Sequence, residues 1–276
     1  MTTAYEPLVE LIAEVPSCLV AFSGGVDSAV VAKAAFLALG DRALAVTGVS
    51  ASLAAGELET ARRIAESIGI RHEIVATNEL ESQGYLENQP SRCWHCKTEL
   101  YDRLRELGHE LGFEVLLNGA NADDLGDFRP GMQAGEQHQV RSPLAECGLN
   151  KQAVRDLAHY WNLEVWDKPA TPCLSSRVVY GLSITPERLA RIDAAEQLLR
   201  RLGFDTVRVR YHHGDLARLE VALADLPRLC EPEVRSQLVS ELREAGFQYV
   251  TIDLEGFRSG SFQQMVSAED LLRFSK

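Results

Sequence analysis

The six residues from Ser23 to Ser28 have the types and the order that bind a phosphate. They read Ser-Gly-Gly-Val-Asp-Ser and lie between an apolar run, 18–22, and a helical pattern, 28–39. A buried strand, a glycine turn and a helix start in this order form an anion cradle, because free N–H groups of the helix N-terminus face the turn. The hydroxyls of Ser23 and Ser28 can add hydrogen bonds, and Asp27 can hold a metal ion or a ribose. The loop is not the Gly-x-x-x-x-Gly-Lys-Ser/Thr phosphate loop, since no lysine follows its second glycine.

The two glycines of this loop, Gly24 and Gly25, let the backbone turn sharply and approach a phosphate closely. The whole loop resembles the pyrophosphatase loop, or PP-loop, of enzymes that split ATP into AMP and pyrophosphate. Those enzymes adenylate a carbonyl oxygen, and a nitrogen or sulfur nucleophile then displaces AMP. The alternative interpretation is a tight strand–helix turn with a serine cap. Six specified residues at a predicted strand–helix junction favour the phosphate cradle.

Three of the six cysteines form a second group with chemical potential. Cys93 and Cys96 make a C-x-x-C motif before a predicted helix that begins near Lys97, and a helix N-terminus favours the thiolate that binds metal. Cys173 follows the last predicted parallel strand, so we expect it near the same edge of the sheet. Three thiolates without an obvious fourth ligand are typical of a [4Fe–4S] cluster with one open iron. The alternative is a zinc site completed by water or histidine, with Cys173 buried.

The other three cysteines have no partner at short spacing. Cys18 opens a predicted buried strand, and Cys147 and Cys230 are interpreted as small apolar residues. We expect no disulfide framework, because a reducing compartment keeps thiols free.

Polar side chains follow the strand predicted at 114–119. Gly119 lies in this segment, and Asp123 and Asp124 bring two carboxylates that could hold Mg²⁺ beside ATP. A polar turn built from asparagine and aspartate is the alternative interpretation. Lys97 could neutralise a phosphate, or it could be a solvated lysine at a helix start.

Arginines gather in the last third of the sequence. Arg208 and Arg210 alternate with valines, so both share one face of a predicted strand, and we expect Arg177 and Arg258 to join them. Converging arginines bind carboxylate and phosphate groups through paired hydrogen bonds. Surface ion pairing is the alternative for Arg208 and Arg210. Glu196, on the preceding helix, is a candidate metal ligand.

The elements that must position these residues alternate along the first part of the chain. Helix patterns lie between the apolar runs at 28–39, 57–68, 97–111 and 151–161. The runs themselves predict strands at 18–22, 42–50, 72–76, 114–119 and 164–167. This alternation indicates an α/β fold, a parallel sheet with helices on both faces, in which a ligand lies at the carboxyl ends of the strands.

The pattern changes after a connection at 168–181. A helix at 186–202, a strand pair at 206–212 and 217–221, helical sequence at 226–245 broken by Pro232, a strand at 249–254 and a short helix at 267–274 predict a small α+β domain. We therefore expect a nucleotide-binding domain over 1–180 that carries the cysteine site. A substrate-binding and oligomerisation domain is expected over 181–276.

The chain of 276 residues carries a net charge of −12. A protein that grips a polyanion usually shows a basic field, so the acidic balance argues against a nucleic-acid substrate, although a local basic patch stays compatible with it. Residues 1–16 lack a basic start and do not resemble a signal peptide, and no run is long and apolar enough for a membrane span. We expect a cytoplasmic protein.

Several motifs together resemble one family, the ATP-dependent sulfur transferases of nickel-pincer nucleotide cofactor biosynthesis, the LarE type. The resemblance covers most of the chain, and the combination is more specific than the PP-loop alone. Its motifs are the loop at Ser23, the segment Lys168–Arg177, the pair Tyr180-Gly181, the strand Val207–Arg210 and the segment Gly256–Gly260. The resemblance implies an adenine nucleotide α-hydrolase-like fold and a homo-oligomer, a hexamer in this family.

The resemblance also implies the reaction. The substrate would be pyridinium-3,5-biscarboxylic acid mononucleotide, whose carboxylates are adenylated with ATP and Mg²⁺ and converted to thiocarboxylates. Some members give up the sulfur of a single cysteine placed like Cys173. Others carry cysteines like Cys93 and Cys96 as well, and hold a [4Fe–4S] cluster whose extra sulfide is transferred. In this scheme Arg177, Arg208 and Arg210 would hold the phosphate and the second carboxylate of the substrate.

Three other functions fit part of the pattern. A tRNA thiolase pairs the same loop with a three-cysteine cluster, but it needs a surface for tRNA. An amidating ligase of the NAD or GMP synthetase kind uses ammonia and leaves the cysteines unexplained. A nucleotide-sensing domain with a structural zinc ion would bind zinc and release no pyrophosphate.

Overall fold

The computed structural model describes residues 6–126 and 130–258, so the helix predicted at 267–274 lies outside the described residues. These residues form two compact units. The first contains 6–50, 56–79 and the described part of 93–171, and the second contains 51–55, 80–92 and 172–258. Residues 172–180 group with the second unit, and the domain boundary expected at residue 180 remains a prediction.

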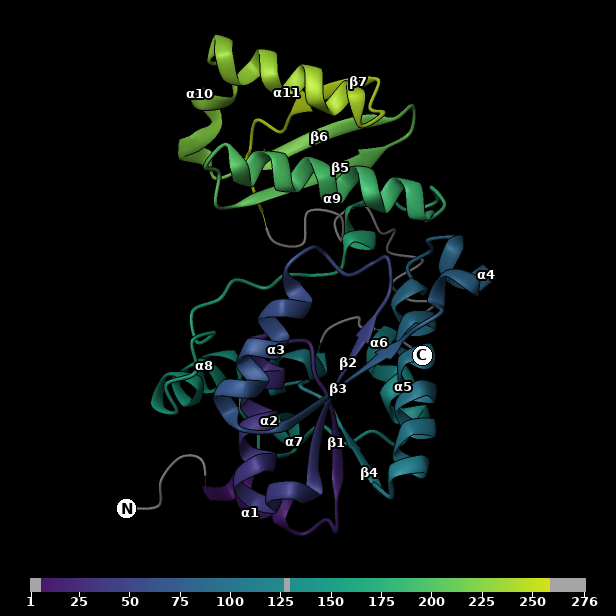
Figure 1. Cartoon of the computed structure of the whole chain (residues 1–276), viewed down its shortest axis with the longest axis vertical. Helices are drawn as coiled ribbons and strands as arrows, with labels where there is room; N and C mark the ends of the chain where they lie inside the picture. The colour runs from purple at the N-terminus through teal and green to yellow at the C-terminus, as the bar shows by residue number, and fades with distance from the viewer. Residues whose placement is uncertain (1–5, 127–129, 259–276) are drawn as a thin grey trace. The chain divides into compact units, whose positions relative to one another are not determined.

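The first unit is built on a parallel sheet of four strands in the order β3-β2-β1-β4 (Figure 1). Every neighbouring pair is parallel, with Cys18 of β1 opposite Ala43 of β2 and Val115 of β4. The strands are β1 (Cys18–Ala21), β2 (Ala43–Val49), β3 (Arg71–Ala76) and β4 (Val115–Leu117). Their carboxyl ends therefore lie at one edge, where the predicted loop begins.

Helices cover both faces of this sheet, because successive strand residues point to opposite sides. Cys18 and Val20 pack into one apolar cluster with α2 (Val26–Leu39) and α3 (Glu57–Ile68). Leu19 packs into another cluster with Leu104 of α5 (Arg92–Leu111). Figure 1 shows α2 and α3 on one side of the sheet and α5 on the other. The predicted α/β fold is confirmed.

The remaining helices of the first unit precede β1 or follow β4 in the chain. Asn150 caps the helix that begins at Lys151, since its Oδ1 accepts the N–H of Ala153 at 2.9 Å. These helices are α1 (Glu6–Ala13), α6 (Pro130–Gln137), α7 (Pro143–Glu146) and α8 (Lys151–Tyr160). Short 3₁₀ turns lie at Gly40–Arg42 and Ala122–Gly126, and a third, Glu79–Glu81, lies where the chain passes to the second unit.

Two sequence predictions for the first unit are wrong. Residues 164–167 form turns, closed by hydrogen bonds such as Trp166 N–H to Leu163 O, and not a fifth strand. Val165 is buried, but its burial comes from packing into the apolar cluster of β1 and not from a strand ladder. The helix expected from Lys97 begins at Arg92, so it includes Cys93 and Cys96.

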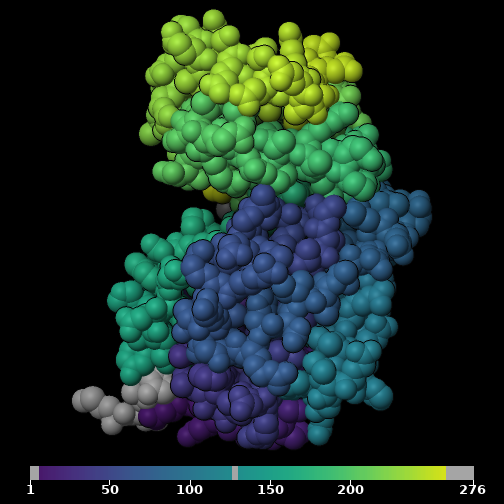
Figure 2. Space-filling model, viewed as in Figure 1, coloured from purple at the N-terminus to yellow at the C-terminus, as the bar shows by residue number. Residues whose placement is uncertain are grey.

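The second unit has a three-stranded sheet in the order β5-β6-β7, with β5 and β6 antiparallel and β6 and β7 parallel. Side chains of α9 and α11 form its surface on the side that faces the viewer in Figure 2. The helical sequence at 226–245 is interrupted before Pro232, as predicted, because proline cannot donate a helical hydrogen bond. The elements are α4 (Gln83–Leu86), α9 (Pro186–Arg201), β5 (Val207–His212), β6 (Leu216–Val221), α10 (Leu226–Leu229), α11 (Pro232–Glu244) and β7 (Tyr249–Ile252), with 3₁₀ turns at Leu174–Arg177 and Leu223–Asp225.

The helices of the described residues differ from a membrane-spanning helix in length or in hydropathy. None of their helices combines the length and the apolar character that crossing a bilayer requires.

The contribution of α5 to the core can be measured with one substitution. Leu104 is fully buried between α5 and the sheet, whereas Leu111 at the end of the same helix is 46 % exposed. We expect Leu104→Ala to lower the free energy of unfolding by about 2–5 kcal/mol through lost burial and a residual cavity. Leu111→Ala, the matched control, should change it by less than about 0.5 kcal/mol. Urea unfolding followed by circular dichroism measures both, and equal effects would contradict this packing.

Candidate active site

The glycine loop after β1 is held by close backbone packing. Gly24 has a φ of +69°, and a Cβ at this position would lie 2.9 Å from the Cα of Ala61 in α3. Both the backbone conformation and the space therefore require glycine. Gly25 is the N-cap of α2 and offers no side chain to its N–H groups, which leaves the helix end to an external acceptor.

The two serines of the loop hydrogen-bond within it. The hydroxyl of Ser28 donates to the carbonyl of Gly25 at 3.0 Å and accepts the N–H of Ser23 at 3.3 Å. The hydroxyl of Ser23 accepts the N–H of Gly25, also at 3.3 Å. The serines thus fix the shape of the loop, and the backbone N–H groups at the start of α2 are the donors directed out of it.

Asp27 lies in the first turn of α2 between two partners from distant parts of the chain. Its Oδ1 accepts a hydrogen bond from Nδ2 of Asn121 at 3.1 Å, and its Oδ2 forms an ion pair with Lys151. The backbone N–H of Lys151 donates to Oδ2 of Asp123 at 2.9 Å. The start of α8 therefore joins Asp27 and Asp123, two of the candidate metal ligands that the sequence predicts.

The segment after β4 approaches the loop as closely as backbone allows. A Cβ at Gly119 would lie 2.8 Å from the backbone nitrogen of Ser28, so only glycine fits. In the turn that follows, Asp124 accepts the N–H of Asn121, and Asn121 accepts the N–H of Asp123. This segment is the polar turn of the alternative interpretation, and Asn121 within it contacts Asp27. Binding of magnesium by these carboxylates remains a prediction.

Sequence reasoning missed Lys151. The loop carries no lysine of its own, and Lys151 lies far along the chain at the first position of α8. One signal could have found it: Asn150 is a strong N-cap residue in front of a predicted helix. A helix that follows a strand begins at the edge where the strands end. Lys97, which the sequence does single out, lies with its Nζ 5.8 Å from the ring centre of Tyr101.

The C-x-x-C cysteines occupy the first turn of α5. Cys93 is exposed and Cys96 is half-buried, and their spacing of three residues puts them on one side of the helix. Cys173 is also half-buried and precedes the 3₁₀ turn at Leu174–Arg177 in the second unit. Accessible thiols are the donors that an iron–sulfur cluster requires. Within 6–126 and 130–258 no three metal-binding side chains are grouped, so the gathering of these thiols remains a prediction.

The other cysteines differ from this trio in their surroundings. Cys18 is buried in β1, and burial raises the pKa of its thiol to about 12. Burial also raises the pKa of Cys147, which packs against the same apolar cluster. Cys18 and Cys147 thus belong to the core, as expected, whereas Cys230 is exposed and does not.

Three of the four predicted arginines, Arg177, Arg208 and Arg210, are buried in the second unit, and Arg258 is half-buried. Arg177 is 1 % exposed and forms two hydrogen bonds with the fully buried carboxylate of Glu196, at 2.9 and 3.2 Å. Arg210 binds the buried Glu220 at 2.9 and 3.0 Å. Surface ion pairing is therefore wrong as the explanation of Arg210. Removing one partner of such a buried pair would lower the free energy of unfolding by about 3–5 kcal/mol, because the remaining charge would be buried without compensation.

Arg208 shares the strand face with Arg210, as predicted. Its guanidinium carbon lies 5.3 Å from the ring centre of Phe257. Burial lowers the pKa of Arg208 to about 10, and the nearby charge of Arg177 acts in the same direction. The buried carboxylates of Glu196 and Glu220 act in the opposite direction, and binding of an anionic ligand by these arginines remains a prediction.

Two further predicted residues complete this part of the site. Arg258 forms ion pairs with Asp253 at 3.2 Å and with Glu255 at 2.5 Å. The carboxylate of Glu196 accepts from Arg177, from Arg200 and from the N–H of Val209. Its role as a metal ligand remains a prediction.

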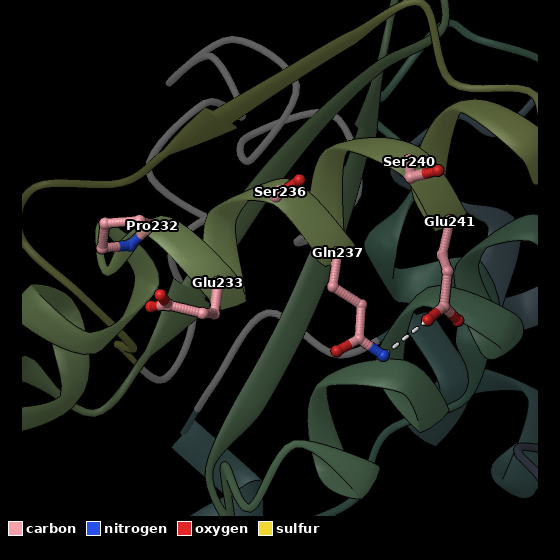
Figure 3. Close-up of a pocket in the computed structure, with 6 residues that line it drawn as sticks. All are labelled: Pro232, Glu233, Ser236, Gln237, Ser240 and Glu241. Carbon is pink, nitrogen blue, oxygen red and sulfur yellow. Dashed lines mark hydrogen bonds between the residues drawn. The ribbon is translucent and has the colours of Figure 1, made fainter.

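A shallow hollow on α11 contains none of these residues (Figure 3). It is formed by one helix face, on which Nε2 of Gln237 donates to Glu241 at 2.7 Å. Glu233 lies near its other end. Its lining includes two glutamates, of which Glu241 forms an ion pair with Arg201 at 3.3 Å.

Comparison with known proteins agrees with this geometry. Residues 11–105, which include the glycine loop and the C-x-x-C motif, match the family described as NAD synthase. An uncharacterized protein of Synechocystis sp., slr1717, is 45 % identical over 95 % of this chain and 97 % of its own. The tRNA-specific 2-thiouridylase MnmA of Rickettsia rickettsii is 29 % identical over 59 % of this chain and 54 % of its own.

A relative of assigned activity matches the whole chain. It is the pyridinium-3,5-bisthiocarboxylic acid mononucleotide synthase of Lactiplantibacillus plantarum, which is 35 % identical over 100 % of this chain and 99 % of its own. The similarity therefore extends through both units. The chain belongs to the family of pyridinium-3,5-bisthiocarboxylic acid mononucleotide synthases, the LarE family.

Proposed function

We propose that this protein is an ATP-dependent sulfur transferase. It adenylates the carboxylates of pyridinium-3,5-biscarboxylic acid mononucleotide and converts them to thiocarboxylates for the nickel-pincer nucleotide. The observation that carries the proposal is the full-length similarity to the synthase of Lactiplantibacillus plantarum. The glycine loop supports the ATP half of the reaction, and the buried arginines support an anionic substrate.

The ATP end of the site lies around α2. Backbone N–H groups at the start of the helix bind the leaving pyrophosphate, and the Nζ of Lys151 neutralises part of its charge. Asp27, Asp123 and Asp124 would hold Mg²⁺, which would share the charge of the phosphates. Since Lys151 pairs with Asp27 in this structure, the lysine is already held at the position where the negative charge arrives.

The substrate end uses the arginine cluster of the second unit. Arg208 and Arg210 bind the phosphate and the carboxylate that is not reacting, with Arg177 and Arg258 beside them. Glu196 fixes the guanidinium of Arg177, so this arginine is oriented before the substrate arrives. Holding both reactants in place replaces a bimolecular entropy loss.

The sulfur end consists of the three accessible thiols. Cys93, Cys96 and Cys173 would hold a [4Fe–4S] cluster, which would supply sulfide at its open iron. Arg177 fixes the Cys173 backbone by donating to its carbonyl at 3.0 Å. We further propose a homo-oligomer, because the family forms hexamers.

A tRNA thiolase is the second candidate function, because part of the chain resembles the 2-thiouridylases. The net charge of −12 disfavours it, since binding of a polyanion is driven by phosphate neutralisation. Retention of labelled tRNA by the purified protein would favour this candidate, and retention of the pyridinium mononucleotide favours the first.

The central test is the reaction itself. With ATP, Mg²⁺ and the biscarboxylic acid mononucleotide, the anaerobically reconstituted protein should release AMP and pyrophosphate and form a thiocarboxylate visible by mass spectrometry. Asp27→Ala should abolish AMP formation and keep the iron content, because Asp27 belongs to the ATP end. Unchanged AMP release by Asp27→Ala would remove the loop from the mechanism.

Lys151 can be tested separately. We expect Lys151→Met to lower the rate of AMP formation about 10²–10³-fold, the range for removing one preorganised donor from a developing negative charge. Lys33→Met is the control, since Lys33 is a lysine of α2 itself but its Nζ lies 5.8 Å from the centre of the Phe36 ring. AMP release at the wild-type rate in both variants would show that Lys151 serves only to pair with Asp27.

The metal content tests the thiol trio. We expect about four irons per chain after anaerobic reconstitution, and loss of iron when any of Cys93, Cys96 or Cys173 is changed to alanine. Cys230→Ala is the control, because this cysteine is exposed and lies outside the trio. Stoichiometric zinc that survives Cys173→Ala would refute the cluster.

A further inference from the structure

A buried polar network lies in the second unit directly before the C-x-x-C motif. Its centre is Asn88, which is fully buried and has a φ of +51°. The Nδ2 of Asn88 donates to the carbonyls of Val179 and Leu182, both at 2.9 Å. A buried asparagine with this many partners fixes the two segments that it joins, because each unmade bond would cost about 1–3 kcal/mol.

Arg92 is the second member of this network. It is only 4 % exposed, and its Nη1 donates to Oδ1 of Asn88 at 2.5 Å and to the carbonyl of Ser175 at 2.8 Å. The hydroxyl of Tyr85 also bonds to the hydroxyl of Ser175, at 2.5 Å. Residues 85–92 are therefore fastened to Ser175 by two side chains.

The segment around Ser175 is held by three buried arginines. Arg92 binds the carbonyl of Ser175, Arg177 binds the carbonyl of Cys173, and Arg210 binds the carbonyl of Ser176 at 3.1 Å. Charged donors on neighbouring carbonyls leave this backbone little freedom. Cys173 therefore sits on a backbone that is rigid before any ligand binds.

Arg92, which binds the carbonyl of Ser175, directly precedes the C-x-x-C motif. Arg92 is the first residue of α5, and a peptide bond joins it to Cys93. Ser175 follows Cys173 by two residues. The hydrogen bond from Arg92 to Ser175 therefore links the chain immediately before one proposed ligand to the chain immediately after another.

We propose that Arg92 is a positioning residue that aligns the start of α5 with the Cys173 segment and so preorganises the thiols. This inference rests on the proposed function, in which the three thiols bind one sulfur-carrying group. Ordering these segments beforehand removes the entropy that their ordering would otherwise take from binding. The same alignment would keep the thiols in register when the sulfur is given up.

The test measures the proximity of two thiols in the metal-free full-length protein. Dibromobimane, which joins two neighbouring thiols, is applied to a Cys96→Ser background, and the Cys93–Cys173 cross-link is measured by peptide mass spectrometry. We expect a cross-link in the parent and a yield about tenfold lower in Arg92→Met and Arg92→Gln, because the effective concentration of one thiol near the other falls. Arg103→Met is the matched control, since Arg103 lies on the same helix and forms its ion pairs with the half-buried Glu99 and the exposed Glu106.

The melting temperature of each variant shows whether it folds. If Arg92→Met does not fold, the cross-linking yield of Arg92→Gln is used to test the proposal. A folded variant that cross-links Cys93 to Cys173 as well as its parent overturns the proposal. Iron content of the same substitutions in the wild-type background separates this inference from the function. An Arg92-dependent cross-link in a protein that takes up no iron supports the positioning role and contradicts the cluster. Equal iron and equal cross-linking with and without Arg92 contradict the positioning role alone.

Discussion

Backbone packing at the start of α2 is the constraint on which the ATP end of this protein depends. Gly24 leaves no side chain against Ala61, and Gly119 leaves none against Ser28. A Cβ at either position would push α3 or the segment after β4 away from the loop. With both glycines in place, the helix N–H groups, Asp27 and Lys151 share one edge of the parallel sheet.

The second unit must accommodate cations inside a small core. Glu196 and Glu220 neutralise Arg177 and Arg210, and a buried charge without such a partner would be strongly destabilising. The same two guanidinium groups also bind carbonyls near Cys173. One set of buried ion pairs thus both stabilises the fold and shapes the Cys173 segment.

Much of the fold could be predicted because its signals are local. The helix at 57–68 agrees at both ends with the structure, since Gly56 and Gly69 have positive φ values of 83° and 84° and end the helical pattern. The error at 164–167 arose because a buried valine in a turn has the same apolar signal as one in a short strand. The early start of α5 was missed because Arg92 is held there by Asn88 and Ser175, and Ser175 is distant in the sequence.

The sequence by itself determined the chemistry of the glycine loop, the thiols and the arginine-bearing strand. Those properties depend on residue type and on spacings of a few positions, which strand and helix periodicities convert directly into faces and turns. Only the tertiary structure decided that Lys151 pairs with Asp27 across 124 positions, that Arg92 reaches Ser175, and that the arginines are buried with glutamates. Ion pairs and hydrogen bonds depend on distance in space, and no local pattern encodes which distant side chains packing will bring together.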